Sequence, residues 1–366
     1  NGPWLFYRTP SDNHFNGSQE EWIANWAKEW KADAIIGRWD ESKLHLLDDL
    51  NIPIVLQNIK SRSDIHSNLT GDYIGTGQLA ARYFRKKFYT SYAYFGRKDI
   101  IWSEERERGF REEVMKENSR YSQYNEIAGT TYDRQSLADW LKSLPQGTAL
   151  LCCDDAHALT ITETCTMAGI KIPDDIAVLG VDNDDLICEI SDPTISSIEL
   201  DVENGGYQTC KLLHQQILSK DKKQFNVFIS PLEITERNST LVHNISDQHI
   251  KNIMKFIDEN YMNDISMDEI FELVPLSRRS VELRFKKATG VTIYQHLLSI
   301  RVEHLAYLLR TTDRPYVDLA YEVGFRDINN VSRTFRKYKD STPLEYRRQF
   351  RVMNDNSKSD KQINHE

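Results

Sequence analysis

The sequence predicts a two-part protein, in which an α/β part with parallel sheets is followed by an all-helical part with two helix-turn-helix units. Three observations predict this. Up to about residue 230, short β-branched runs alternate with helix-like segments, as they do in parallel sheets flanked by helices. Beyond residue 248 the pattern is wholly helical. The charge balance also changes, because residues 244–351 hold 18 Lys/Arg against 15 Asp/Glu in a chain of net charge −9.

The first part contains enough strand candidates for two parallel sheets. They are residues 4–8, 34–36, 54–56, 92–95, 149–153, 176–181 and 227–230. The helix candidates between them are residues 20–30, 40–50, 75–87, 104–118, 136–142, 155–168 and 202–218. Ligands of such folds bind at the carboxyl ends of the strands, so the residues directly after each strand are the candidates for a binding site.

The second part opens with a capping signal and repeats one pattern twice. Residues 238–248 are polar without a period and predict a linker. Ser266 and Glu269 form a capping-box pattern. The helices expected after it are 267–274, 277–289, 293–310, 315–323 and 327–339. Short helix, break and second helix occur twice, which predicts two helix-turn-helix units. The predicted divisions are 1–240, a linker at 241–248, a helical domain at 249–350, and a disordered tail at 351–366.

The second helix of each pair carries polar side chains suited to DNA. In 327–339, Asn329, Arg333 and Arg336 fall on one face; Asn can bond adenine and Arg can bond guanine bidentately in a major groove. Lys337 and Lys339 could neutralise phosphates. The full set of predicted DNA contacts is Arg278, Arg279, Glu282, Arg284, Asn329, Asn330, Ser332, Arg333, Arg336 and Lys337. The alternative is a solvated charged face. Two copies of the pattern favour DNA.

Two segments of this region resemble the halves of an AraC-type DNA-binding domain. They are "LSRRSVELRFKKATGVTIYQHLLSIRVEHLAYLL" and "DLAYEVGFRDINNVSRTFRKYKDSTPLEYRR". The chain departs from the family's usual residues at Val331, at Asp340, where Gly is usual, and at Leu283, where Arg often contacts DNA. The resemblance implies sequence-specific binding to operator DNA.

Polar residues follow several strands of the first part. Asp182 and Asn183 follow 176–181, Asp154 follows 149–153, and Asp72 precedes a helix that starts near Gly75. Carboxylates that meet at one edge of a sheet suit a ligand with adjacent hydroxyls. The alternative for Asp154 and Asp155 is a helix N-cap. Trp39 and Trp102 stand at strand ends, where an indole could stack on a sugar; each could equally be a packed aromatic.

The first part resembles the effector domain of LacI/GalR-type regulators. The matching segments are "RERGF" (106–110), "CCDDAHAL" (152–159), "AGIKIPDDIAVLGVDNDD" (168–185) and "DPTISSIELD" (192–201). The resemblance implies a two-lobed periplasmic-binding-protein-like fold of type I, with a ligand cleft at the hinge. By family position it implies Arg106, Asp154 and Asp182 as the main effector contacts, with Asp72 behind them.

The domain order, with the segments "IWSEERERGF" and "YQTCKLLHQQIL", resembles a family of xylose-responsive transcriptional activators. This implies D-xylose as effector, a homodimer on operator DNA, and RNA polymerase as a partner, with no cofactor. The alternatives are a regulator of another monosaccharide, a stand-alone sugar-binding protein, and a sugar-acting enzyme. No nucleophile, metal-ligand set or glycine-rich phosphate loop frames the carboxylates, so we expect no enzyme.

Composition limits the location of the protein. The five cysteines have no metal-ligand spacing and predict reduced thiols in a cytoplasmic protein. No apolar run approaches the ~20 residues of a membrane span, so no membrane partner is expected. The sequence opens at Asn1, almost directly before a strand-like run, and we expect a first strand and helix to be missing from it.

Overall fold

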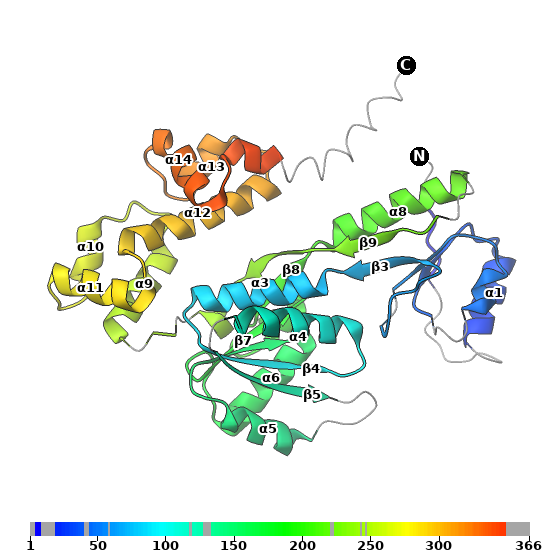
Figure 1. The fold of residues 1–366 in the computed structure, drawn as a ribbon, viewed down its shortest axis with the longest axis horizontal. Coiled ribbons are helices and arrows are strands. Elements are labelled where there is room, and N and C mark those ends of the chain that lie inside the picture. The colour runs from blue at the N-terminus through cyan, green and yellow to red at the C-terminus, as the bar shows by residue number, and fades with distance from the viewer. Residues whose placement is uncertain are drawn as a thin grey trace. The chain divides into compact units, whose positions relative to one another are not determined.

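The computed structural model describes residues 4–8, 19–39, 44–57, 59–116, 119–126, 133–219, 223–241, 244–245 and 247–348. The chain forms two compact units, Asn1–Leu241 and Val242–Glu366 (Figure 1). The tail predicted at 351–366 lies outside the described residues.

The first unit is built on two separate sheets. The smaller has the order β1-β2-β3-β9 and is parallel, with strands Ile35–Gly37 (β1), Ile54–Leu56 (β2), Ser67–Gly71 (β3) and Asn226–Ile229 (β9). The larger has the order β10-β8-β7-β6-β4-β5, with strands Ser91–Arg97 (β4), Arg120–Glu126 (β5), Thr148–Cys152 (β6), Ile176–Val181 (β7), Ser196–Leu200 (β8) and Pro231–Thr235 (β10). Of these, β10 alone is antiparallel to its neighbour.

The chain passes between the two sheets three times. It passes through α3 (Tyr73–Lys86) after β3, through α8 (Val202–Ser219) after β8, and directly from β9 to β10. The other helices of this unit are α1 (Gln19–Glu29), α2 (His45–Asp48), α4 (Ile101–Val114), α5 (Arg134–Ser143), α6 (Asp155–Ala168) and α7 (Asp185–Ile190). A parallel sheet and a mostly parallel sheet, joined by crossing segments, confirm the predicted two-lobed α/β class.

Hydrophobic cores cover both faces of the larger sheet. Tyr94 and Phe95 are neighbours in β4 and are both fully buried, but they belong to different clusters. Tyr94 packs with Phe84 of α3 and Phe110 of α4. Phe95 packs with side chains of α5 and α6. Because successive side chains of a strand point to opposite faces, a nearly continuous apolar run is what a strand buried on both faces requires.

The helices α3 and α4 approach each other backbone to backbone. A Cβ at Gly77 would lie 2.1 Å from the carbonyl oxygen of Arg106, and one at Gly109 would lie 2.2 Å from the carbonyl oxygen of Ile74. Only glycine tolerates this distance at both positions. The close contact brings the start of α3, with Asp72 before it, toward the middle of α4.

The strand predictions were correct for six of seven segments and wrong for residues 4–8. The segments at 54–56 and 176–181 coincide with β2 and β7. Residues 4–8 belong to no strand in the described chain, and Leu5 and Phe6 are exposed. A strand needs a ladder partner for its backbone, and an apolar run alone does not provide one. Strands β3, β5, β8 and β10 were not predicted.

The second unit is helical. Its helices are α9 (Gln248–Asn260), α10 (Met267–Glu272), α11 (Arg278–Thr289), α12 (Ile293–Thr311), α13 (Tyr316–Glu322) and α14 (Ile328–Lys339). The pairs α10–α11 and α13–α14 confirm the two predicted helix-turn-helix patterns. The capping box of Ser266 with Glu269 is present. Of the residues that depart from the AraC-type pattern, Val331 is fully buried in the core and Asp340 adopts φ 55°, the left-handed conformation that glycine favours.

The end of the first unit includes part of the polar stretch interpreted as linker. Residues Asn238–Thr240 form a short 3-10 helix in which Ser239 and Thr240 are buried. The Ser239 hydroxyl donates to the carbonyl of Val178 at 2.6 Å. Among the described residues, no helix is both long and apolar enough to cross a bilayer.

Candidate functional site

Arg106 lies at the centre of the predicted effector site. Its side chain is 4% exposed, and Nη2 lies 3.4 Å from Oδ1 of Asp182. Nη1 donates to the carbonyl oxygen of Cys153, the last residue before Asp154. Within the described chain, the buried Nε has no hydrogen-bond partner. A buried cation with an unused donor is costly unless a further acceptor completes its bonding.

Two aromatic rings flank this guanidinium. Its carbon lies 5.5 Å from the ring centroid of Tyr73 and 5.4 Å from that of Trp102. Tyr73 begins α3, and Trp102 lies one turn before Arg106 in α4. Rings beside a charged group offer an apolar face next to strong hydrogen-bonding atoms, which is how a binding site receives the C–H face and the hydroxyls of one sugar.

The turn after β7 holds Asp182 in a strained conformation. Asp182 has φ 106° and Asn183 has φ 52°, a left-handed pair in which neither residue is glycine. Three backbone N–H groups fasten the turn: Asp182 to the Ile198 carbonyl, Asn183 to Ser197 Oγ, and Asp184 to the Asp155 carboxylate. The Asp182 side chain remains 51% exposed. Strain of this kind costs about 1–3 kcal/mol per residue and concentrates at ligand sites.

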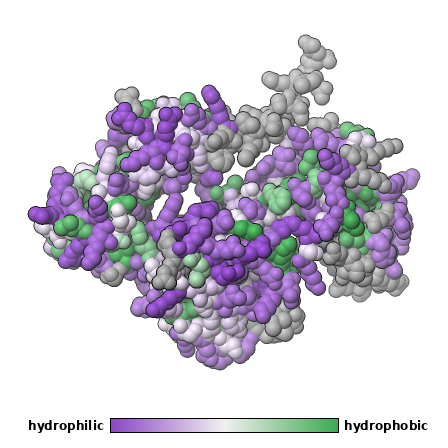
Figure 2. Space-filling model, viewed as in Figure 1, coloured by the Kyte–Doolittle hydropathy of each residue, from purple (hydrophilic) through white to green (hydrophobic). Residues whose placement is uncertain are grey.

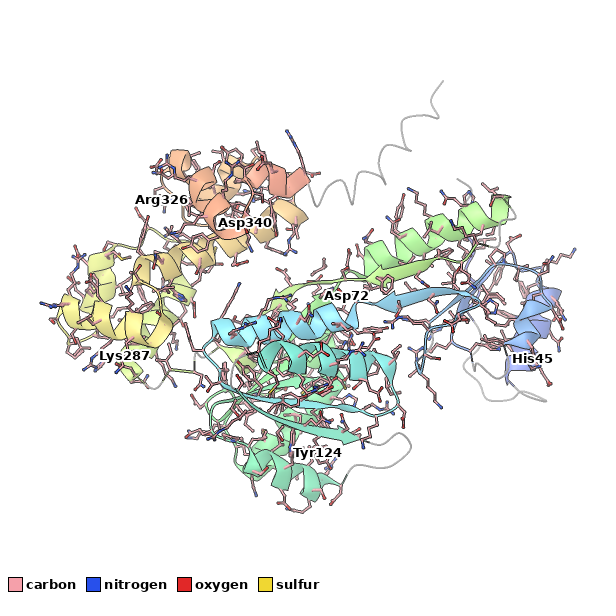
Figure 3. All side chains as sticks on the ribbon, viewed as in Figure 1. His45, Asp72, Tyr124, Lys287, Arg326 and Asp340 are labelled. Carbon is pink, nitrogen blue, oxygen red and sulfur yellow. The ribbon has the colours of Figure 1, made fainter. Side chains whose placement is uncertain are left out.

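The side chains of the three other predicted polar effector residues, Asp72, Asp154 and Asn183, already accept hydrogen bonds from within the first unit. Asp72 caps α3 through Gly75 N at 2.9 Å, and Figure 3 shows it at the start of that helix. Asp154 caps α6 and accepts from the backbone and ring of His157, both at Oδ1. The N-cap alternative is therefore correct for Asp154, and Oδ2 is the oxygen that a ligand could use. The amide oxygen of Asn183 accepts from Arg237 at 2.9 Å.

His157 and Arg106 together keep Asp154 ionised. Burial raises the pKa of Asp154, but the hydrogen bonds from His157 and the charge of Arg106 outweigh it and hold that pKa below its ordinary value. Asp155, the next residue, is 2% exposed and inside the fold rather than at the site. Its burial raises its pKa to about 6.

The two tryptophans have different positions. Trp102 contacts Arg106 and stays a candidate for ligand stacking. Trp39 is 8% exposed and belongs to a core cluster with Leu44, Leu47 and Leu56. Its position favours the packed-aromatic alternative, because a ring that fills a core is not free to cover a ligand.

The sequence analysis missed Arg62, which follows β2. It forms a two-bond ion pair with Glu105 of α4, at 2.9 and 2.6 Å. Its guanidinium lies 5.7 Å from the Tyr73 ring and 5.9 Å from the Phe228 ring of β9. Arg62 follows the predicted strand 54–56, and its position after that strand was the signal that could have identified it.

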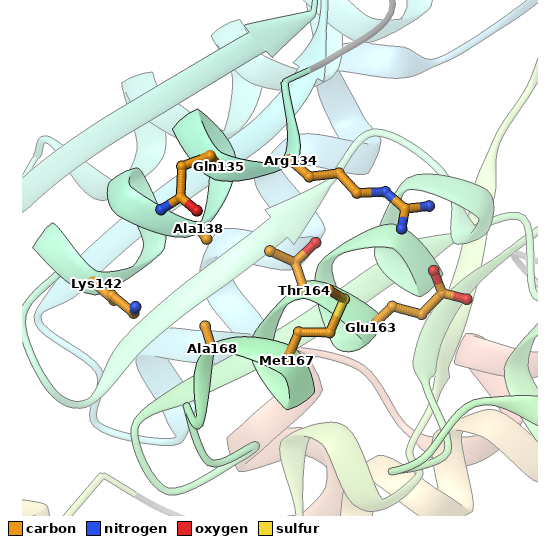
Figure 4. Close-up of a pocket in the computed structure, with 8 residues that line it drawn as sticks. All are labelled: Arg134, Gln135, Ala138, Lys142, Glu163, Thr164, Met167 and Ala168. Carbon is orange, nitrogen blue, oxygen red and sulfur yellow. The ribbon is translucent and has the colours of Figure 1, made fainter.

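Three further features belong to other parts of the first unit or are explained by hydrogen bonding. A cavity of 160 Å³ lies between α5 and α6, lined by Arg134, Lys142 and Glu163 (Figure 4). A larger one, of 480 Å³, lies at the amino ends of β2 and β3. Neither includes a predicted effector residue, and the carboxyl ends of the strands are where parallel sheets bind ligands.

Donor atoms of Cys153, Asp154 and His157 lie within 4.8 Å of one another. Burial raises the pKa of the Cys153 thiol, and the His157–Asp154 hydrogen bond explains their proximity without a metal.

In the second unit, α11 and α14 carry the predicted DNA contacts. Figure 2 shows mostly hydrophilic residues on the drawn face of this unit, with hydrophobic ones scattered. On α14, Arg333 and Lys337 are exposed and have no ion-pair partner among the described residues, whereas Arg336 lies 3.5 Å from Glu345. Asn330 is exposed and donates to Asp327, and Ser332 is half-buried. Asn329 lies in α14, and its side chain is outside the described atoms.

On α11, the predicted contacts are exposed but mostly paired within the chain. Arg278 contacts Asp268 and Glu282, at 3.6 and 3.3 Å, and Arg284 contacts Asp247 at 3.3 Å. Arg279 is exposed and has no such partner among the described residues. Exposed pairs of this kind exchange readily for phosphate, because each contributes little to stability.

Comparisons with known proteins agree with this two-unit architecture. Residues 81–240 match the family described as periplasmic binding protein-like domain, and residues 272–349 match that described as helix-turn-helix domain. The xylose operon regulatory protein of Escherichia coli strain K12 is 28% identical over 87% of this chain and 85% of its own length. That of Haemophilus influenzae is 27% identical over 86% and 84%.

Two solved structures have a similar fold. The structure of the xylose-binding transcription activator xylR matches with a TM-score of 0.54 and 24% identity, over 92% of this chain and 96% of that one. A LacI family regulator from Enterococcus faecalis with bound ribose matches with a TM-score of 0.51 and 22% identity, over 61% and 83%. The chain is a homologue of the xylose operon regulatory proteins, which are transcriptional regulators and not enzymes, and in it a periplasmic-binding-protein-like domain precedes a helix-turn-helix domain.

Proposed function

We propose that this protein is a sequence-specific DNA-binding activator of genes for xylose uptake and catabolism, with D-xylose as its effector. The observation that carries the proposal is the Arg106–Asp182 pair beside Tyr73 and Trp102, in a chain that also holds two helix-turn-helix units. The relatives matched over most of their length are named for the xylose operon, which supports this sugar.

The chemistry of the cluster supports a monosaccharide. A carboxylate accepts from two adjacent hydroxyls, and a guanidinium donates to a ring or hydroxyl oxygen. Asp182 and Oδ2 of Asp154 supply acceptors, and Nε of Arg106 supplies an unused donor. Ribose is the second candidate, because solved structures of similar fold contain it.

A thermal-shift screen of the full chain against pentoses and hexoses tests the effector. We expect D-xylose to stabilise the chain more than ribose or glucose, by ~2.7 kcal/mol at 100 times its dissociation constant. A larger effect from ribose would assign the response to that sugar, and no effect from any monosaccharide would contradict the proposal. Product analysis after incubation with pentoses separates regulation from turnover.

The proposal includes a cytoplasmic homodimer that aligns two helix-turn-helix domains on one operator and contacts RNA polymerase. Two reading helices in each chain suit a repeated half-site, and paired half-sites match a two-fold dimer. Sedimentation of the chain on operator DNA measures the number of protomers. A single chain on the operator, with and without sugar, would contradict the dimer.

The reading role of α14 has its own test. We expect Arg333→Ala to weaken binding to operator by ~1–3 kcal/mol and to random DNA much less, because a base contact is lost. Lys337→Ala should weaken both equally and reduce the salt slope by about one unit, because a phosphate contact is lost. Anisotropy titrations with a fragment selected from a random library provide both affinities.

Lys339→Ala is the matched control on the same helix. The sequence offers Lys339 as a phosphate contact, but its amine pairs with Glu303 at 2.5 Å and its side chain is only 19% exposed, so its loss should leave DNA affinity unchanged. Equal losses on operator and random DNA for Arg333→Ala would make that residue a phosphate anchor. Full affinity in both α14 variants would leave the basic helix as a solvated face.

A further inference from the structure

Every nitrogen of the Arg237 guanidinium has a partner in the Asp182–Asn183 turn, in α7 directly after it, or at Ile195. Nη1 donates to Oδ1 of Asn183 at 2.9 Å and to the carbonyl of Ile195 at 3.0 Å. Nη2 lies 3.2 Å from Asp185, and Nε donates to Glu189 at 2.7 Å. The side chain is 10% exposed. The sequence analysis assigned no role to this residue.

The backbone of Arg237 is fastened as firmly as its side chain. Its N–H donates to Oγ of Ser196 at 2.7 Å, and that hydroxyl also donates to the carbonyl of Arg237 at 2.9 Å. Ser196 and Thr240 hydroxyls lie 2.6 Å apart. Arg237 therefore stands where the chain leaves the first unit, which ends at Leu241, and α9 of the DNA-binding unit begins at Gln248.

A second set of bonds ties the same exit segment to α3. The Tyr83 hydroxyl donates to Glu236 at 2.9 Å and lies 2.6 Å from Oγ1 of Thr240. Lys87, directly after the helix, pairs with Glu236 at 2.7 Å. Asp72, a predicted effector contact, caps the other end of α3. The exit segment is therefore held by α3 and by the Asp182–Asn183 turn, and a predicted effector contact lies at each of them.

We propose that Arg237 is a positioning residue that couples the Asp182–Asn183 turn to the exit segment, so that effector binding at Asp182 changes DNA affinity through this guanidinium. The inference rests on the proposed function. A sugar that binds Asp182 favours one arrangement of the strained turn, and this changes the position of the next residue, Asn183. The planar guanidinium of Arg237, which donates to Asn183, must then move with it or lose the hydrogen bond. Coupling requires such differential contacts between two states.

A plain structural role predicts a different result. If Arg237 only holds the lobe together, its loss lowers stability and leaves the response to sugar intact. If Arg237 couples the two sites, the variant still binds D-xylose and still binds the operator, but the sugar no longer changes operator affinity. Coupling between two sites is commonly 5–150-fold and is reciprocal, so the effect must be the same whichever ligand is added first.

The test measures operator affinity of the full chain with and without saturating D-xylose. We expect the wild type to show a ratio in the 5–150-fold range and Arg237→Lys to show about 2-fold or less, because lysine keeps the charge and loses the fork. Affinity for D-xylose without DNA should change by less than about 3-fold. In the reciprocal measurement, the operator should change the affinity for D-xylose by the same factor as D-xylose changes the affinity for the operator, in the wild type and in the variant alike.

Two further variants keep the result interpretable. Arg111→Lys is the matched control, because Arg111 pairs with Glu107 at 2.8 Å in α4, away from the exit segment, and its ratio should match the wild type. Asp185→Asn with Glu189→Gln removes the negative charges of both ion-pair partners of Arg237 while Arg237 stays, and should lower the ratio even if Arg237→Lys folds poorly. A wild-type ratio in either test variant overturns the inference alone. A wild type that binds D-xylose nowhere overturns the proposed function instead.

Discussion

Asp182→Ala is expected to abolish the stabilisation that D-xylose gives to the full chain. The wild type should gain ~2.7 kcal/mol at 100 times the dissociation constant, and the variant close to none. Removal of the carboxylate deletes an exposed acceptor and leaves Arg106, buried and 3.4 Å away, without its ion-pair partner. Operator affinity without sugar should not change. Thermal unfolding with and without D-xylose measures the first effect and anisotropy the second.

A second substitution separates charge from backbone strain at this position. Asp182 has φ 106°, which alanine tolerates poorly, whereas asparagine occupies positive φ more readily. Asp182→Asn should therefore keep the turn and still lose the sugar response. Asp139→Asn, on the surface of α5 and bonded to Gln135, is the control and should respond as the wild type does. A normal D-xylose shift in both Asp182 variants would remove this residue from the site.

The free energy of unfolding of the first unit should depend on pH through Asp155. Its carboxylate accepts from Ser197 Oγ at 2.5 Å and from Asp184 N at 2.8 Å, and burial raises its pKa to about 6. A folded pKa above the ordinary 3.8 means that the folded state holds the proton more tightly. This contribution is fully present below about pH 4 and is lost as pH rises through about 6. The difference between these two pKa values corresponds to about 3 kcal/mol.

Asp155→Asn removes this titration, since an amide does not ionise. Between about pH 4 and pH 7, wild-type stability should fall by about 3 kcal/mol relative to the variant, apart from a constant offset for the changed hydrogen bonds. The chain has 7 tryptophans, all in the first unit, so their fluorescence during urea unfolding follows that unit alone. Parallel stability curves for the two proteins across this pH range would contradict a raised pKa at Asp155.

Much of the architecture could be predicted because it depends on neighbours in the sequence. Buried apolar runs such as 54–56 and 176–181 became strands, and the Ser266–Glu269 pair became a capping box. The helix pairs of the second unit were predicted from the spacing of apolar residues. Gly290, at the end of α11, and Gly324, between α13 and α14, adopt left-handed conformations. In each case the signal spans a few residues, which is the range over which propensity and capping act.

The polar strands show where local signals end. β3 reads Ser-Asn-Leu-Thr-Gly and was not predicted, yet Ser67, Asn68 and Thr70 are buried in it. Asn68 is satisfied by bonds to the Ser63 carbonyl and to Asn226, which is 158 residues away. A buried polar side chain is acceptable only when partners are supplied, and here one of the partners, Asn226, comes from the other end of the first unit.

The sequence by itself determined the two-part organisation, the polar residues after the strands, and the basic helices of the second unit, because each depends on residue type and short spacing. The tertiary structure alone decided which of these residues meet. It paired Arg106 with Asp182 across 76 positions, placed Trp39 in a core, and brought Arg237 to Asn183 across 54 positions. Contacts at such separations arise when strands pair and helices pack, and no local pattern specifies the partner.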